Sequence, residues 1–402
     1  MKDRRQDTDP RMRPIRFAVF ALAALVVLSL GFALIPAEKP APAEPPFSER
    51  ARAAAFSAAL DLRAAGMQLA SAGAADSTAV DPVVTLLTIQ ARALMPPGAA
   101  SVTGAPTGPA GGPPQASPQA GASPASVAGP RNTAELVQAL ATSGAIRLRD
   151  AETADGGMAR LLAGAGTAQL IAAGRLAAAA GVPAPQGTPG PDAEAPGTAA
   201  AASPCPSPSV QAMLSPAPSG TPASAPPASA PSVSAPSAKD SAAPGTAPGT
   251  RQALAAAVSA EQRAVYGYQA ALPRLAPAEA GPASEFLGVH KDLAAAAAER
   301  LRAACGGPVP QQPGYVLDPG FLAAPAAGLG KLEAATLASY GDVVAVSQGQ
   351  DRTWALAALR SAAGRALRWG ADPGPVPGLL LDTGQLPALP AGTGLAPSAA
   401  AS

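Results

Sequence analysis

Residues 253–272 read ALAAAVSAEQRAVYGYQAAL, and this stretch decides the fold. Its larger side chains recur at alternating spacings of four and three, from Leu254 and Val258 to Tyr268. This periodicity is typical of an amphipathic helix that buries one stripe of side chains against other helices. Glu261 falls on that stripe, where an apolar residue is expected. The segment therefore predicts a bundle helix with a carboxylate on its buried face.

Three further helices are predicted downstream, so that the C-terminal part is expected to be all-α, as a four-helix bundle. Residues 283–304 place His290, the only histidine of the chain, on their apolar stripe. Residues 329–347 place Glu333 on theirs, and residues 352–369 carry four arginines and no acid. A single long connection, here between the second and third helices, is found in four-helix bundles of the ferritin-like type.

The composition limits what the rest of the chain can be. Proline and glycine supply 48 and 41 of the 402 residues, aromatic residues make up only 3%, and the formal net charge is +1. So few aromatic side chains argue against one large globular enzyme, because these residues dominate core energetics. A near-neutral chain lacks the basic surface that nucleic-acid binding requires, so no nucleic acid is expected among its partners.

An unbroken apolar run, FAVFALAALVVLSLGFALI, occupies residues 17–35. At roughly 1.5 Å per residue, a helix of this length spans about 30 Å of hydrocarbon. Six basic residues precede the run, and the positive-inside rule then keeps the N-terminus cytoplasmic and exports the bulk of the chain. We expect a single-pass anchor in the cell membrane. A cleaved signal peptide is the alternative, with Ala41-Pro42-Ala43 as the nearest cleavage motif.

Two alanine-rich helical hairpins are predicted between the anchor and the bundle. The first begins near Ser48 and restarts at Asp81, which is followed by a proline suited to a first helical position. The second opens at Asn132 or Thr133 and breaks at Gly156. Two such hairpins can together close another four-helix bundle with a shallow, alanine-rich core.

Proline-rich stretches without aromatic residues separate the helical segments. They cannot bury enough apolar area to offset the entropy of the chain, so they are expected to be disordered. The predicted order is a cytoplasmic basic tail (1–16), a transmembrane anchor (17–35), a proline-rich spacer (36–46), a helical hairpin (47–97), a disordered linker (98–130), a second hairpin (131–182), a second disordered linker (183–249), the four-helix bundle (250–372) and a disordered tail (373–402).

The C-terminal helices also resemble a known family. The resemblance is carried by the opening segment, then VHKDLAAAAAERL (289–301), KLEAATLASYGDVV (331–344), and ALRSAAGRALRWG with PVPGLL (358–380). In this order they resemble a ferritin-like domain of unknown function from exported or membrane-tethered actinobacterial proteins, over about residues 250–381. GGMARLLAGAGTAQLIAAGRL (156–176) is similar to the helical region preceding that domain. The resemblance implies a four-helix bundle outside the cytoplasmic membrane and no assigned reaction.

Three residues on the predicted stripes are candidate metal ligands: Glu261, His290 and Glu333. A di-iron carboxylate site takes a glutamate from each of two helices and a Glu-x-x-His pair from each of the other two. Leu287 stands where His290 would need its paired acid, and residues 352–369 offer neither acid nor histidine. We therefore expect no dinuclear site and no bound cofactor. A mononuclear site at the three residues remains as an alternative.

The arginines of the last helix suggest another use for the same glutamates. A buried carboxylate is costly unless it is paired with a cation. Arg365 and Arg368 fall on the stripe of residues 352–369, so that either can meet Glu261 or Glu333 in an ion pair that replaces the metal. The alternative is that these charges lie at the edge of the stripe and reach water.

The remaining reactive side chains predict no enzyme. With one histidine and no thiol beside it, a Ser/His/Asp or Cys/His nucleophile is not expected, and no catalytic residue is assigned. The bundle's tyrosines, Tyr266, Tyr268 and Tyr340, are expected in its core or stripe with their hydroxyls toward its polar middle. Cys205 and Cys305 are a candidate disulfide, because an exported chain permits one, and two free thiols are the equal alternative.

Together these features predict a membrane-anchored, extracytoplasmic ferritin-like protein without a complete di-iron site. A non-enzymatic binding or structural role at the cell envelope follows. The alternative is a metal-binding protein, of the storage or oxidase type, with an atypical site at Glu261, His290 and Glu333. A third interpretation is a scaffold whose hairpins bind another envelope protein. The sequence indicates no oligomeric state.

Overall fold

A computed structural model of the 402-residue chain describes residues 20–25, 44–72, 77–97, 129–185, 249–317 and 319–390. The chain divides into two compact units, Met1–Pro45 and Pro46–Ser402. In the first unit, residues 20–25 are helical, and Phe20, Leu22 and Leu25 are exposed. The rest of the predicted anchor and most of the predicted linkers lie outside the described residues.

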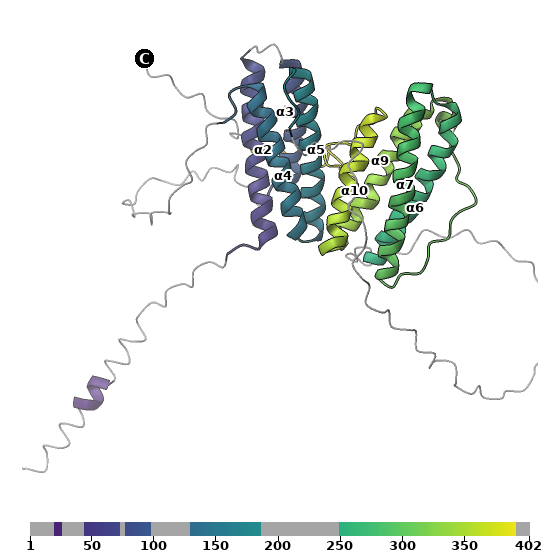
Figure 1. Cartoon of the computed structure of the whole chain (residues 1–402). Helices are drawn as coiled ribbons and strands as arrows, with labels where there is room; N and C mark the ends of the chain where they lie inside the picture. Colours follow the sequence, from purple (N-terminus) through teal and green to yellow (C-terminus); the bar gives the residue numbers. More distant parts are fainter. Residues whose placement is uncertain are drawn as a thin grey trace, which may run out of the picture. The chain divides into compact units, whose positions relative to one another are not determined.

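The second unit is built of helices, and its described residues contain no strand. Four of them form what we call the N-terminal half, and the others form the C-terminal half (Figure 1). The N-terminal half comprises α2 (Phe47–Ser71), α3 (Ser77–Leu94), α4 (Thr133–Thr153) and α5 (Gly156–Ala180). The C-terminal half comprises α6 (Thr250–Ala271), the 3-10 turn η3 (Leu272–Arg274), α7 (Pro277–Ala303), the short α8 (Pro319–Ala323), α9 (Pro325–Val346) and α10 (Gly349–Arg368). The predicted all-α fold is confirmed.

Local capping explains where the second hairpin begins and turns. The Asn132 side chain accepts a hydrogen bond from the Glu135 backbone N–H at 2.9 Å, and the Glu135 carboxylate accepts one from the Asn132 amide at 3.0 Å. This reciprocal pair fixes the start of α4, since the first bond satisfies a backbone donor that lacks a helical partner and the second holds the Asn132 side-chain amide in place. Asp155 caps α5 through the Met158 N–H, and Gly181, with a φ of 65°, ends that helix.

The first hairpin differs from its predicted boundaries. Ser48 does not cap α2. Its hydroxyl lies inside the first turn and accepts a hydrogen bond from the Asp155 N–H at 2.8 Å, which ties the starts of α2 and α5 together. In addition, α3 starts at Ser77, before Pro82, and α7 starts before Pro282 in the same way. Each proline removes a single helical hydrogen bond, and that loss did not prevent the preceding turn from forming.

The two halves contact each other through α5, α9 and the ends of α4 and α10. Arg352, at the start of α10, donates to the carbonyl oxygens of Ala151, Glu152 and Ala154 at 3.3, 3.2 and 2.6 Å. These carbonyls belong to the last turn of α4 and the residue after it, so a cation from one half caps a helix C-terminus of the other. Arg160 of α5 also pairs with an acid of α9, Asp342, at 2.6 Å.

Residues 373–390 also differ from the prediction of a disordered tail starting at 373. They run back along the N-terminal half, where Val376 is only 2% exposed. The carbonyl oxygen of Pro375 accepts from Gln90 Nε2 at 2.9 Å, and that of Gly378 accepts from Arg160 Nε at 2.6 Å. Side-chain donors from α3 and α5 thus hold a segment whose composition alone predicted no structure.

Within the described part of the chain, α5 is the one helix long and apolar enough to cross a membrane. It is 78% buried over its most apolar window, and Leu162, Ala163 and Ala173 are fully inaccessible to solvent. Burial of that extent is typical of the core helix of a folded domain. The apolar run at 17–35, apart from residues 20–25, lies outside the described residues.

Candidate functional site

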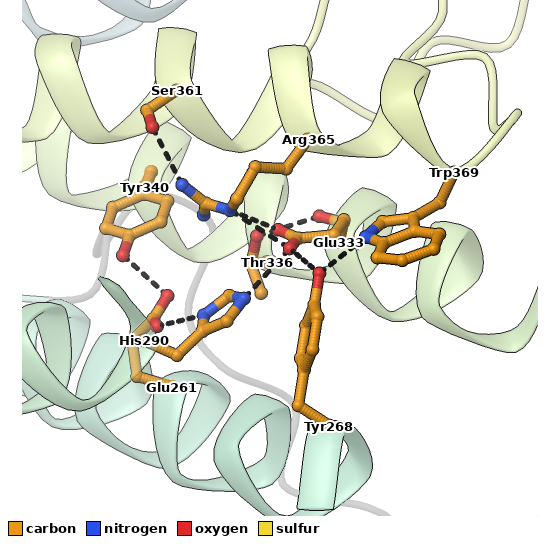
Figure 2. Close-up of polar contacts among 9 residues, drawn as sticks. All are labelled: Glu261, Tyr268, His290, Glu333, Thr336, Tyr340, Ser361, Arg365 and Trp369. Carbon is orange, nitrogen blue, oxygen red and sulfur yellow. Dashed lines mark hydrogen bonds and ion pairs between the residues drawn. The ribbon is translucent and has the colours of Figure 1, made fainter. Parts of the chain in front are cut away.

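The candidate site is a buried polar network at the centre of the C-terminal half (Figure 2). Four long helices each contribute to it. The members are Glu261 and Tyr268 from α6, His290 from α7, Glu333, Thr336 and Tyr340 from α9, Ser361 and Arg365 from α10, and Trp369 directly after α10. The acids, the histidine and Arg365 are all 0% exposed. The sequence-predicted stripes therefore place their polar members together.

His290 bridges the two carboxylates. Its Nδ1 lies 2.7 Å from Glu261 Oε2, and its Nε2 lies 2.8 Å from Glu333 Oε1 (Figure 2). An imidazole ring donates from both nitrogens only when it is protonated, and ionised carboxylates can only accept. Burial alone lowers the His290 pKa, but the charges of Glu333 and Glu261 outweigh it and raise the pKa to about 9. The geometry thus describes an imidazolium between two carboxylates.

Arg365 completes the environment of Glu333. Its Nε donates to both oxygens of that carboxylate, at 2.9 and 3.0 Å, and its Nη1 donates to Ser361 Oγ at 2.7 Å. Burial by itself raises the Glu333 pKa, but Arg365 and His290 reverse this effect and lower the pKa to about 2. Burial likewise lowers the Arg365 pKa, but the attraction of Glu333 and Glu261 raises it above its usual value. Both groups of this pair are charged near neutral pH.

Two tyrosine hydroxyls close the ends of the network. Tyr340 donates to Glu261 Oε1 at 2.6 Å, and Tyr268 donates to Glu333 Oε1 at 2.6 Å. The indole N–H of Trp369 in turn donates to the Tyr268 hydroxyl at 2.7 Å. Burial and the neighbouring carboxylates raise the pKa of both tyrosines far above the usual range, so both remain neutral donors.

The network is electrically balanced and closed to solvent. Two carboxylates face one guanidinium and one imidazolium, so that these four groups together carry no net charge. Aromatic rings pack against it, with Tyr268, Phe286 and Trp369 in edge-to-face contact at 6.1 to 6.4 Å between centroids. Two hollows of about 540 and 740 Å³ occur in the described part of the chain, and no network residue lines either. The polar network therefore holds the helices of the C-terminal half together rather than admitting a ligand.

The three candidate metal ligands lie together, but each is already committed. The two ring nitrogens of His290 face different carboxylates. A metal ion bound to one of these nitrogens would therefore lie next to only one of the two acids. The positively charged Arg365 guanidinium lies against the Glu333 carboxylate and would repel a metal cation there. Among the described residues, no group of three or more His, Cys, Asp or Glu side chains is arranged to hold a metal ion. These residues do not fit a metal centre.

The other candidate residues lie elsewhere. Arg368 does not contact the glutamates; its guanidinium lies 5.6 Å from the Trp369 ring centroid. Tyr266 is outside the network and packs on Tyr315 at 5.5 Å between ring centroids. Cys305, just after α7, is disulfide-bonded, while Cys205, the other cysteine of the chain, lies outside the described residues.

Thr336, Ser361 and Trp369 were not among the candidate site residues. Ser361 and Trp369 each lie four residues from Arg365, so the spacing along α10 could have suggested both. Thr336 bonds only to the Glu333 carbonyl oxygen, at 2.7 Å, and supports the backbone rather than the charges.

Comparison with known proteins gives one family. Residues 253–380 match the Domain of unknown function (DUF4439) family. The match spans α6 to the start of the segment after α10, and so contains the entire polar network. No curated protein and no solved structure matches the chain significantly.

Proposed function

We propose that this chain is a membrane-anchored, extracytoplasmic protein of ferritin-like architecture in which an ion-pair network replaces the metal centre. The observation that carries the proposal is the contact of Arg365 with Glu333, since it pairs a fixed cation with a carboxylate that the metal-binding alternative would need as a ligand. The polar network around this contact contains Glu261 of α6, Glu333 of α9 and His290 of α7. The role that follows is structural or binding, without catalysis.

The chain order supports the ferritin-like part of the proposal. The helices α6 and α7 are joined by a short turn through η3, as α9 and α10 are joined around Ser347 and Gln348. Between α7 and α9 the chain makes its long crossover, which holds only the five-residue α8. Four helices with one long crossover are found in ferritin-like folds. The Arg-rich, Lys-poor composition, 23 against 5, suits an actinobacterial source.

Elemental analysis of the full chain tests the absence of a metal centre. The protein is purified from cells supplied with iron, manganese and zinc, and then dialysed without chelator. We expect far less than one bound metal ion per chain. One tightly held transition-metal ion per chain, lost when Glu261 and Glu333 are both changed to Gln, would instead support the metal-binding alternative.

The anchor is a separate part of the proposal and rests on the apolar run at 17–35. We expect the full chain in the membrane fraction after high-salt washing. When protease is added to cells that have lost their wall but keep an intact membrane, it should remove the C-terminal half and leave the first residues protected. A chain found in the soluble cytoplasmic fraction would contradict both the anchor and the extracytoplasmic location.

A binding role is proposed for the N-terminal half, with another envelope protein as its partner. The hollow of about 740 Å³ between α3 and α5 supports this, because apolar residues such as Val83, Leu86 and Ile171 line it. A chain lacking residues 48–182 should lose any specific partner that the full chain retains on a column. An unchanged set of partners would move the binding role to the C-terminal half.

A further inference from the structure

The N-terminal half contains a buried arginine that lacks hydrogen-bond acceptors for two of its nitrogens and a close carboxylate for its positive charge. Arg147, on the inner face of α4, is 4% exposed. Fully buried Leu140 and Ala151 lie on the same face, and Gly166 of α5 packs so closely that a Cβ there would approach Arg147 Cβ to 2.9 Å. A guanidinium in such surroundings is costly unless its donors and its charge are matched.

The described residues supply no such match for Arg147. Its Nε and Nη1 are both buried without a hydrogen-bond partner. The nearest paired carboxylate is Asp150, whose Oδ2 lies 3.8 Å from Nε, beyond hydrogen-bond distance, on a side chain that is 21% exposed. Burial lowers the pKa of Arg147 and Asp150 offsets part of this, but an arginine remains charged at any pH near neutrality.

A second unpartnered group lies beside this arginine on the same helix. Ser143 is 6% exposed, and its hydroxyl is buried without a hydrogen-bond partner. It precedes Arg147 by four residues, which places the two side chains one above the other on the same helix face. Two arginine N–H groups and a hydroxyl, one helical turn apart on the same face of α4, are thus all buried without an acceptor.

From these observations we infer that Ser143 and Arg147 form a binding site for a small monovalent anion of the chloride type inside the N-terminal half. One negative charge neutralises the guanidinium, and a spherical acceptor takes hydrogen bonds from Nε, Nη1 and the hydroxyl at once. Water accepts fewer bonds and leaves the positive charge uncompensated. This site is independent of the polar network of the C-terminal half and of the metal question.

Thermal unfolding of the full chain in two salts tests the site. The midpoint is followed by circular dichroism in sodium chloride and in sodium gluconate at equal ionic strength, because gluconate is too large for a buried site. Ligands that bind only the folded state raise the midpoint, and we expect a rise of about 2–4 °C in chloride. Arg147→Met should lose this difference. Arg149→Met, which removes an exposed arginine of the same helix, should keep it.

A second variant decides the matter if Arg147→Met does not fold. Ser143→Ala keeps the charge and removes one donor, so that the chloride concentration at half effect should rise about tenfold. Equal midpoints in the two salts for the unchanged protein would overturn the inference. So would a chloride effect that persists in Arg147→Met, or an unaltered chloride titration in Ser143→Ala.

Discussion

Replacing His290 by glutamine gives the sharpest test of the polar network. Glutamine can donate from its amide nitrogen to one carboxylate, but its oxygen then faces the other. The variant also removes one positive charge from a core that holds two ionised acids. Removing one partner of a buried ion pair costs about 3–5 kcal/mol. We expect His290→Gln to lose about this much unfolding free energy at pH 6.5.

The pH dependence distinguishes this explanation from a simple packing defect. Because the folded pKa of His290 is about 9 and the unfolded value is about 6.5, its contribution is fully present below pH 6.5 and is lost as the pH rises through 9. A difference of this size corresponds to about 3 kcal/mol between these limits. The unchanged protein should therefore lose stability over this interval, while His290→Gln should show a nearly flat profile.

Urea unfolding monitored by tryptophan fluorescence measures this directly. The chain has two tryptophans, Trp354 and Trp369, and both are buried in the C-terminal half. Lys291→Gln, an exposed change at the next position, serves as the control and should alter stability by less than about 0.5 kcal/mol. Parallel profiles of the unchanged protein and His290→Gln between pH 6.5 and 9 would refute the bridging imidazolium.

Three further changes test other contacts. Arg365→Met should cost about 3–5 kcal/mol in urea unfolding, because it strands a buried carboxylate, while Arg368→Met should cost under about 1 kcal/mol; equal costs would contradict the assigned pair. Gly156→Ala places a Cβ 2.2 Å from a carbonyl oxygen of α9 and so weakens the contact between the halves. In limited proteolysis we therefore expect the two halves to be separated faster than in the unchanged protein. Arg352→Met leaves three carbonyl oxygens without this donor and should lower the thermal midpoint by several degrees; no change would show that the cap is dispensable.

The sequence predicted the members of the network better than their pairing. Glu261, His290 and Glu333 were recognised because each interrupts an apolar stripe whose spacing fixes a helix face. The choice between Arg365 and Arg368 could not be made, since they lie three residues apart and small rotations of α10 decide which one faces Glu333. Their contact depends on how four helices rotate against one another, which periodicity alone does not specify.

The same patterns do not predict the starts of α3 and α7 or the docking of the two halves. The sequence predicts helix starts at Asp81 and at residue 283, each next to a proline, but a turn that precedes a proline can still be helical when its other hydrogen bonds form. The contact between the halves depends on bare backbone at Gly156 and on a cap provided by Arg352 from far along the chain. Neither residue shows a periodic signal.

The return of residues 373–390 to the N-terminal half affects the order in which the protein can mature. Gln90 and Arg92 of α3 donate to carbonyl oxygens 285 to 295 residues later, at Pro375, Leu386 and Pro387. During synthesis the first hairpins emerge long before these acceptors exist, and contacts of such sequence separation form late. Gln90 and Arg92 therefore find these acceptors only after nearly the whole chain has been made, and a prematurely terminated chain would leave both side chains without them and open to proteases.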